Sequence, residues 1–468
     1  MSYLNNIGNY GVNSYNPVFS DKKIGKEPLC SNSIKNQKSA DIPFNGIFAD
    51  FFAIKKFNNK QDKAMYDELK ASLPDVDKQN LDVLLKTGKL SNKASNDGSS
   101  TLENLYKILK NPRTRGLNIQ KILGDTIETL ANPYRITQRF GELPPELSQR
   151  LIAEEKNKQM HNALGLSAEQ VKKPNDPESA EDLNITNSAC CVAASIEFNL
   201  ADKKPAEFAR YVEGLTGSDN AVKVKMHYSD VSNNFIDALS LLNQFHSNAK
   251  PLDWNSLEVT VAPDRAAIIR ARVQNTQINP KERNVVDTLM QSTFMQLGSQ
   301  GTYNSLTDKR YGSFNTNDKG LTEFEKNFAE TIVDNDGGKT SVTYQNVDEN
   351  ARLIGYNADY NTILTHLQKT LDSGSNIIIG ITEADQTNKI IGGHEMTIKE
   401  IKKGNKDNEL YFICNDTDDD YVGAVEIKAK ALIPKIHHAG IPNKILGLSP
   451  QVEDTGFALL KEYEKAQK

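Results

Sequence analysis

The sequence predicts an α+β protein, with most of its helices before its antiparallel strands. Through the first two thirds of the chain, apolar residues recur at three- and four-residue steps, which is the period of a helix with one buried face. After about residue 375, short apolar or alternating runs are separated by polar turns, the pattern of antiparallel strands. Helices and strands that are segregated along a chain are typical of the α+β class.

The composition limits the classes of partner. The 468 residues give room for two or three domains, and the net charge of −5 offers no attraction for nucleic acid or an anionic membrane. No run approaches the roughly 18 apolar residues of a membrane span. The first residues lack a basic segment followed by an apolar core, so we expect a cytoplasmic protein, or one exported without a recognisable N-terminal signal.

The N-terminal part divides into three segments. Residues 1–45 are rich in Asn, Ser, Gly and Lys without a sustained period, and predict a disordered tail. Residues 46–170 predict a small helical domain or a prosegment, whose clearest helix has apolar residues from Ile119 to Leu130 and stops before Asn132-Pro133. Residues 171–183 are polar, contain two prolines and predict a linker to a domain of residues 184–468.

The second domain begins with helices and ends with strands. Its predicted helices cover residues 191–198, 205–213, 235–242, 285–297, 322–332 and 360–371. Its predicted strands cover residues 257–261, 376–381, 391–401, 409–414 and 424–427. Residues 266–273 fit a helix or a strand equally well.

The chain has four cysteines, Cys30, Cys190, Cys191 and Cys414, which are too few for a disulfide framework. Cys190 and Cys191 are adjacent in sequence, so a bridge between them would be strained. We expect reduced thiols.

Three polar groups stand where a cysteine nucleophile site needs them. Cys191 opens a helix of small residues, His394 begins a strand after two glycines, and the next strand ends on Asn415-Asp416. A helix N-terminus and a nearby imidazolium both favour the thiolate, which is the nucleophile. The histidine then protonates the leaving group, and a third residue orients its ring.

This order of elements resembles the papain-like cysteine peptidase superfamily, and is especially similar to its bacterial members, including peptidases that process double-glycine leaders. Ser195 lies four positions after Cys191, as in the family, which favours Cys191 over Cys190 as the nucleophile. The resemblance extends over about residues 184–435. It implies a papain-like domain, with a helical subdomain and an antiparallel sheet, preceded by the small helical domain.

The resemblance leaves the third catalytic residue and the oxyanion donor open. The third residue is Asn in papain and Asp in the leader peptidases, and Asn415 and Asp416 supply both. Because strand side chains alternate between faces, only one of the two can meet His394. Family members usually carry a Gln before the cysteine as an oxyanion donor. No Gln stands there, and Asn184 and Asn187 are the available amides.

The expected function is that of a cysteine peptidase that hydrolyses peptide or isopeptide bonds in a protein or peptide substrate through a Cys-His-Asn/Asp triad. Two alternatives keep the fold. A transglutaminase-like acyltransferase uses the same residues in the same order, and a catalytically silent relative would serve as an interaction protein. No phosphate loop or dinucleotide fingerprint is present, so we expect no cofactor.

Two segments invite a metal-binding interpretation. The acidic run Asp416–Asp420 suggests calcium, but Tyr421 stands where a calcium loop needs glycine, so we expect a solvated turn. The pair His437-His438 has no cysteine or carboxylate at a ligand spacing, so we expect a surface or core position and no zinc site.

Overall fold

The computed structural model describes residues 57, 59–141, 143–153, 188–231, 249–253, 256–276, 282–299, 301–310, 320–334, 337–404, 409–418, 422–448 and 465. The predicted tail (residues 1–45), the predicted linker (171–183) and the predicted helix at 235–242 lie outside these residues. Among the described residues, no helix combines the length and apolar character needed to cross a membrane.

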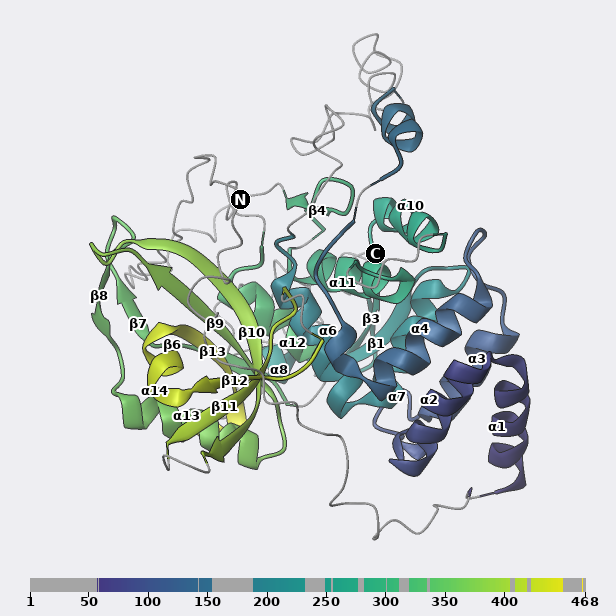
Figure 1. Cartoon of the computed structure of the whole chain (residues 1–468), viewed down its shortest axis with the longest axis horizontal. Coiled ribbons are helices and arrows are strands. Elements are labelled where there is room, and N and C mark those ends of the chain that lie inside the picture. The colour runs from purple at the N-terminus through teal and green to yellow at the C-terminus, as the bar shows by residue number, and fades with distance from the viewer. Residues whose placement is uncertain are drawn as a thin grey trace.

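The first helices form a layer on one side of the molecule, purple to blue in Figure 1. They are α1 (Lys60–Ser72), α2 (Asp75–Lys86), α3 (Thr101–Lys110) and α4 (Ile119–Ala131). Local chemistry sets their ends. Ser100 and Glu103 form a reciprocal capping box at the start of α3, and the Asn118 side chain accepts two backbone N–H groups at the start of α4. Pro133 follows the last turn of α4 and opens a short 3₁₀ turn.

The middle of the chain is also mainly helical. Its helices are α6 (Cys191–Lys203), α7 (Pro205–Thr216), α8 (Tyr228–Val231), α10 (Arg265–Gln274), α11 (Val285–Gly298) and α12 (Glu323–Asp334). A small sheet has the order β1-β3-β2, from β1 (Val222–His227), β2 (Ala249–Pro251) and β3 (Ser256–Val261). Two short strands, β4 (Tyr303–Asn304) and β5 (Lys309–Arg310), form a hairpin after α11.

The last third forms a six-stranded sheet of order β12-β11-β10-β9-β13-β6, yellow-green in Figure 1. Its strands are β6 (Lys339–Thr343), β9 (Ile377–Ala384), β10 (Ile390–Lys403), β11 (Leu410–Asn415), β12 (Val425–Lys428) and β13 (Ile436–Pro442). The hairpin β7 (Gln345–Val347) and β8 (Leu353–Tyr356), and the helices α13 (Tyr360–Asp372), α14 (Ala429–Leu432) and α15 (Asn443–Leu446), complete this part.

The central helix α6 connects the two parts of the molecule. Residues 192–201 are buried on every side of this helix, as expected for a helix surrounded by other elements. It contacts α7, α11 and α12 on one side and strands β9 and β10 of the large sheet on the other. The strand that carries His394 therefore lies directly against the helix that Cys191 opens (Figure 1).

One hydrophobic core includes residues from both sides of the predicted linker. Leu69, Leu105 and Ile122 of the first helices share it with Phe198 of α6 and Phe294 of α11. A second core lies within the large sheet and under α13. This arrangement differs from the predicted division into a helical domain at 46–170 and a separate domain at 184–468. Helix α3 packs against α7, and α4 packs against α6, α7 and α11, while α1 and α2 pack on α3 and α4.

The mixed α+β class with antiparallel sheets is confirmed, since every strand pair among the described residues is antiparallel. Residues 266–273, which the pattern left open, lie in helix α10. Eight of the described strands were not predicted, namely β1, β2, β4, β5, β6, β7, β8 and β13. The omission of β13 matters, because this strand lies inside the sheet between β9 and β6 and carries both His437 and His438.

Candidate active site

Cys191 is the first residue of α6, and its side chain is half-buried. The preceding residue, Cys190, occupies the N-cap position but provides no side-chain hydrogen bond to the first turn. The first N–H groups of a helix have no partner within the helix and carry a partial positive charge. The Cys191 sulfur therefore lies at the end of a helix that favours a negative charge.

A buried polar network holds the loop before Cys191. The Asp308 carboxylate accepts hydrogen bonds from the Ala189 N–H (2.8 Å) and the Ser188 hydroxyl (3.1 Å). The Arg283 guanidinium donates to the same Ser188 hydroxyl at 3.0 Å. Asp308 comes from the β4–β5 hairpin and has a positive φ of 53°, a conformation that a short polar residue tolerates better than most. The hairpin thus fixes the backbone just before the nucleophile candidate.

Cys190 takes part in this network and not in a site with a histidine. Its sulfur lies 3.2 Å from the Tyr303 hydroxyl and 3.3 Å from Asp308 Oδ1, fully buried. Burial, followed by the charge of Asp308, raises the pKa of the Cys190 thiol to about 12. A thiol in this state stays protonated at neutral pH and is a poor nucleophile.

His394 lies near the start of β10, between two neighbours from distant parts of the chain. Its Nε2 is 2.7 Å from Oδ1 of Asp416, which directly follows the last residue of β11. The Cys191 side chain lies close enough to the same ring to help raise the pKa of His394. Because Asp416 occupies Nε2, Nδ1 is the nitrogen that remains for the thiol. The side chains of Cys191, His394 and Asp416 therefore lie next to one another in that order.

The charges around His394 favour the imidazolium. Burial alone lowers the pKa of His394, but the charge and hydrogen bond of Asp416, together with Cys191, outweigh burial and raise it well above the ordinary value. Burial raises the pKa of Asp416, but the imidazole of His394 and the Asp418 N–H reverse this effect and lower it overall. The Asp416–His394 pair is thus an ion pair at neutral pH.

The structure distinguishes the two residues that the sequence left open. Asp416 contacts His394, whereas Asn415 is buried at its register position opposite Thr397, with its side-chain nitrogen lacking a hydrogen-bond partner. The prediction of a solvated acidic turn is wrong for Asp416, because its side chain is only 10% exposed. The close approach of His394 buries this carboxylate, which spacing along the chain did not reveal. Asp419 and Asp420 lie outside the described residues.

Gln138 joins the loop just before Cys191 to the loop that contains Asp416. It was not among the residues predicted from the sequence. Its side-chain N–H donates to the Ser188 carbonyl at 3.0 Å, and its side-chain oxygen accepts from the Thr417 hydroxyl at 3.0 Å. The backbone N–H of Gln138 donates to the Thr417 carbonyl at 3.1 Å. Family members carry such a glutamine just before the cysteine, whereas Gln138 is contributed by the preceding helical region.

Polar contacts also fix α6 against the sheet. The Lys399 ammonium of β10 lies 2.7 Å from the Asp202 carboxylate of α6. The Asn376 amide, next to β9, donates to Asn199 at 3.2 Å and to Asp202 at 3.1 Å. These partly buried contacts lie at the end of α6 away from Cys191, so they orient the helix along its whole length.

The two predicted oxyanion donors, Asn184 and Asn187, lie outside the described residues. The backbone N–H of Cys191, at the uncapped first turn of α6, has the right chemistry for an oxyanion donor. One of the two side-chain N–H groups of Gln138 already donates to the Ser188 carbonyl.

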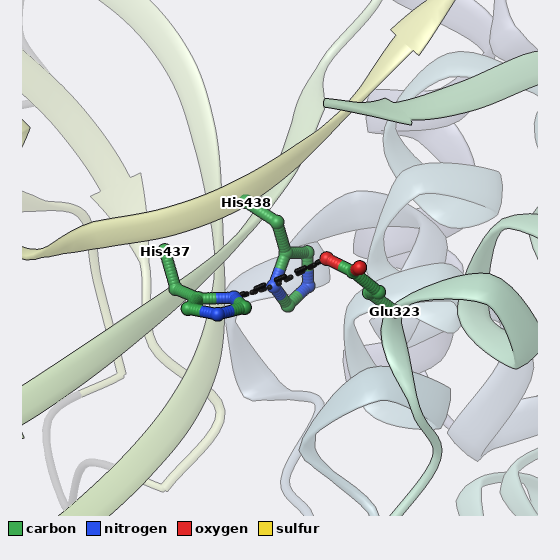
Figure 2. A group of neighbouring side chains, drawn as sticks. All are labelled: Glu323, His437 and His438. Carbon is green, nitrogen blue, oxygen red and sulfur yellow. Dashed lines mark hydrogen bonds and ion pairs between the residues drawn. The ribbon is translucent and has the colours of Figure 1, made fainter. Parts of the chain in front are cut away.

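A second cluster of ligand-type side chains lies apart from Cys191. Glu323, His437 and His438 each offer one ligand atom, and these atoms lie within 4.8 Å of one another (Figure 2). Burial, followed by the neighbouring His438, lowers the pKa of His437 to about 4, so this ring is neutral at neutral pH. The prediction of no zinc site considered only residues close in sequence, whereas Glu323 comes from α12, far upstream.

Comparisons with known proteins identify no family for this chain. No family model, curated protein or solved structure matches this chain.

Proposed function

We propose that this protein is a cysteine hydrolase that cleaves amide bonds, with Cys191 as nucleophile, His394 as general acid and base, and Asp416 as the residue that orients the imidazole. The observation that supports this most strongly is the 2.7 Å contact of His394 with Asp416, together with the proximity of Cys191, which helps raise the pKa of the same ring. Chance proximity of a thiol, an imidazole and a buried carboxylate from three distant segments is uncommon, and perturbed pKa values of this kind cluster at functional sites.

The proposed reaction has two stages, acylation of Cys191 and hydrolysis of the thioester. The Cys191 thiolate attacks the carbonyl carbon of the substrate, and a carbon–sulfur bond forms as the carbon–nitrogen bond breaks. The imidazolium of His394 gives its proton to the departing amine nitrogen. Water then attacks the thioester, the imidazole takes a proton from it, and the carboxylic acid product leaves the Cys191 sulfur.

The surroundings suit this sequence of steps. The Cys191 N–H at the first turn of α6 has no side-chain cap and would serve as a donor to the negative charge that develops on the carbonyl oxygen, where one such donor contributes about 3 kcal/mol to catalysis. The ionised Asp416 keeps the proton on Nε2 and leaves Nδ1 to exchange a proton with sulfur and substrate. The substrate that we propose is a protein or peptide, in which the enzyme hydrolyses peptide or isopeptide bonds.

The test begins with the thiol. The full-length protein is treated with iodoacetamide across pH 5–9, and the alkylated cysteine is identified by mass spectrometry. We expect Cys191 to react faster than free cysteine near neutral pH, and Cys190 to stay unmodified because it is buried. His394→Ala should slow the modification of Cys191. A rate no faster than that of a free thiol contradicts the proposal and favours the non-catalytic interaction protein.

Substrate turnover is tested with a pool of peptides and with ubiquitin-type isopeptide conjugates, followed by mass spectrometry. We expect cleavage that Cys191→Ala abolishes and that His394→Ala lowers by about 10²–10⁴-fold. A dansylated amine added with a glutamine-rich protein distinguishes hydrolysis from acyl transfer. Label incorporated into the protein would identify a transglutaminase-like reaction in place of hydrolysis.

A further inference from the structure

Glu395, the residue after His394 on β10, faces away from the candidate active site. Successive side chains of a strand point to opposite faces, and Glu395 Oε1 lies 2.9 Å from His438 Nε2. His438 belongs to the cluster with Glu323 and His437 (Figure 2). We propose that Glu323, His437 and His438 bind one divalent transition-metal ion of the zinc class. This site stands independently of the function of Cys191.

The distances between ligand atoms suit one ion. The Nδ1 atoms of His437 and His438 lie 2.9 Å apart, and Glu323 Oε2 lies 3.5 Å from the Nδ1 of His438 and 3.9 Å from that of His437. Ligands bonded tetrahedrally at about 2.1 Å are separated by about 3.4 Å. The three observed distances bracket this value, so movements of a few tenths of an ångström complete the geometry.

A β-bulge places both imidazoles in the cluster. Strand neighbours ordinarily point to opposite faces, but the register of β13 against β9 shifts between Ile436 and His438. The shift inserts one extra residue, His437, opposite β9. The two rings then meet edge to face, with centroids 5.2 Å apart and an interplanar angle of 88°.

The second nitrogen of His438 faces a carboxylate. Its Oε1 lies 2.9 Å from His438 Nε2, and its Oε2 lies 3.3 Å from the Lys326 ammonium, so the Glu395 carboxylate is held between two cationic or N–H-bearing neighbours. The distance is that of an ion pair, although Nε2 makes no well-aligned hydrogen bond. A carboxylate this close favours the tautomer with the proton on Nε2, which leaves the lone pair of Nδ1 free for a metal. This carboxylate–histidine arrangement is common behind metal-bound imidazoles.

Gly380 of β9 allows that contact. In the register of the sheet it lies between Glu395 of β10 and His438 of β13. A Cβ atom at Gly380 would overlap the His438 ring and lie 2.6 Å from Glu395 Oε1. A glycine inside a buried strand often marks such a close approach. Any larger residue at this position would separate the imidazole from its carboxylate.

The third ligand is oriented as well. The Glu323 carboxylate accepts hydrogen bonds from the Thr343 hydroxyl (3.1 Å) and the Ser341 hydroxyl (3.2 Å) of β6. Hydrogen bonds of this kind hold metal-bound carboxylates in position. The His437 side chain is 27% exposed, which gives an ion a route from solvent. Three protein ligands leave one tetrahedral position for water. A bound ion would join α12 to the sheet.

The competing explanation is a metal-free imidazole pair, in which His437 Nδ1–H donates to the Nδ1 of His438. Full-length protein is stripped with a chelator, dialysed and titrated with Zn²⁺ by calorimetry, and separately with Co²⁺ by visible absorption. We expect one equivalent of Zn²⁺ beyond any bound at Cys191, a higher melting temperature with Zn²⁺, and ligand-field absorption from Co²⁺. If no such equivalent binds, the metal-free pair is established and the proposal is overturned.

Variants locate the ion. His437→Gln and His438→Gln should each remove that equivalent, and Gly380→Ala should weaken binding by about 10- to 100-fold through the loss of the Glu395 contact. Thr343→Val provides a milder change that leaves the ligands intact and should also weaken binding. Melting of the chelator-treated variants shows whether they fold. Because His437 is partly exposed, His437→Gln should fold normally.

Two control variants separate this site from others. Cys191→Ala removes a thiol that, with His394 and Asp416, is itself a possible zinc ligand, and His366→Gln removes a half-buried histidine next to Tyr344. Both should retain the equivalent at His437 and His438. Zinc binding that is lost in Cys191→Ala but unchanged in His437→Gln and His438→Gln would place the ion at Cys191 and contradict the proposal.

Discussion

At the residue scale, two adjacent residues of β10 face two different clusters. His394 faces Cys191 and Asp416, and Glu395 faces His438 and Lys326. Each is buried with a partner of opposite charge, which is the condition under which an ionised group is tolerated away from water. One strand therefore supports both the candidate active site and the proposed metal site.

Asp416→Asn tests the residue that orients His394. Because the Asp416 charge helps to raise the pKa of His394, its removal should lower the pH at which the ring loses its proton. The NMR titration of the His394 ring protons measures this shift, and the alkylation rate of Cys191 at neutral pH should fall with it. Asn415→Ala is the matched control, and should leave both unchanged. An equal response of the two variants would contradict the proposal that Asp416 orients the His394 ring.

At the element scale, a buried pair of carboxyl groups connects α6 to α11. Glu197 and Asp287 are both fully buried, and one oxygen of each, Glu197 Oε1 and Asp287 Oδ1, lacks a conventional donor. Burial, followed by the charge of Asp287, raises the pKa of Glu197 well above its ordinary value. A proton on Glu197 that is shared with Asp287 would satisfy both oxygens.

Glu197→Gln should make the stability less dependent on pH. A carboxyl group with a raised pKa in the folded state contributes stability that is complete below its unfolded pKa and lost as the pH rises through the folded pKa. Glutamine has an N–H donor and cannot ionise. Thermal melting from about pH 4 upward, starting near the ordinary carboxyl pKa, should therefore show a smaller decline than in the wild type. Exposed Glu349→Gln is the control, and a variant curve parallel to the wild type would contradict the shared proton.

At the scale of the whole molecule, the helices before residue 153 and those after residue 190 share one hydrophobic core. Leu69, Ile122 and Leu130 are fully buried in a core that also contains Phe198 and Phe294. The loss of large apolar side chains from such a core costs about 2–5 kcal/mol each, and the total stability of a protein is only about 5–15 kcal/mol. This argues against the helical region as a removable prosegment.

Deletion of residues 1–170 should therefore prevent folding. We expect an aggregated product, or a soluble one without a cooperative thermal transition by circular dichroism. Deletion of residues 1–45, the segment that composition predicts to be disordered, is the control and should preserve the transition. A fragment of residues 171–468 that melts cooperatively would instead support the two-domain division predicted from the sequence.

Several features followed from the sequence alone because they depend on local chemistry. Caps, prolines and apolar periods predicted helices such as α4, α11 and α13, and alternation predicted β9, β10 and β11, since each signal lies within the element itself. The same local signals identified Cys191, His394 and the Asn415-Asp416 pair as candidates. Strand β13 was missed because its histidines and glycine obscure the apolar pattern.

Only the tertiary structure could decide which candidates meet. The choice of Asp416 over Asn415 depends on how the chain turns at the end of β11, and the contact of Glu323 with His437 and His438 depends on the packing of α12 against β13 and on a bulge. Gln138 joins the site because the first helices share a core with α6. Contacts between distant segments arise from the packing of whole elements, which the spacing of residues along the chain does not record.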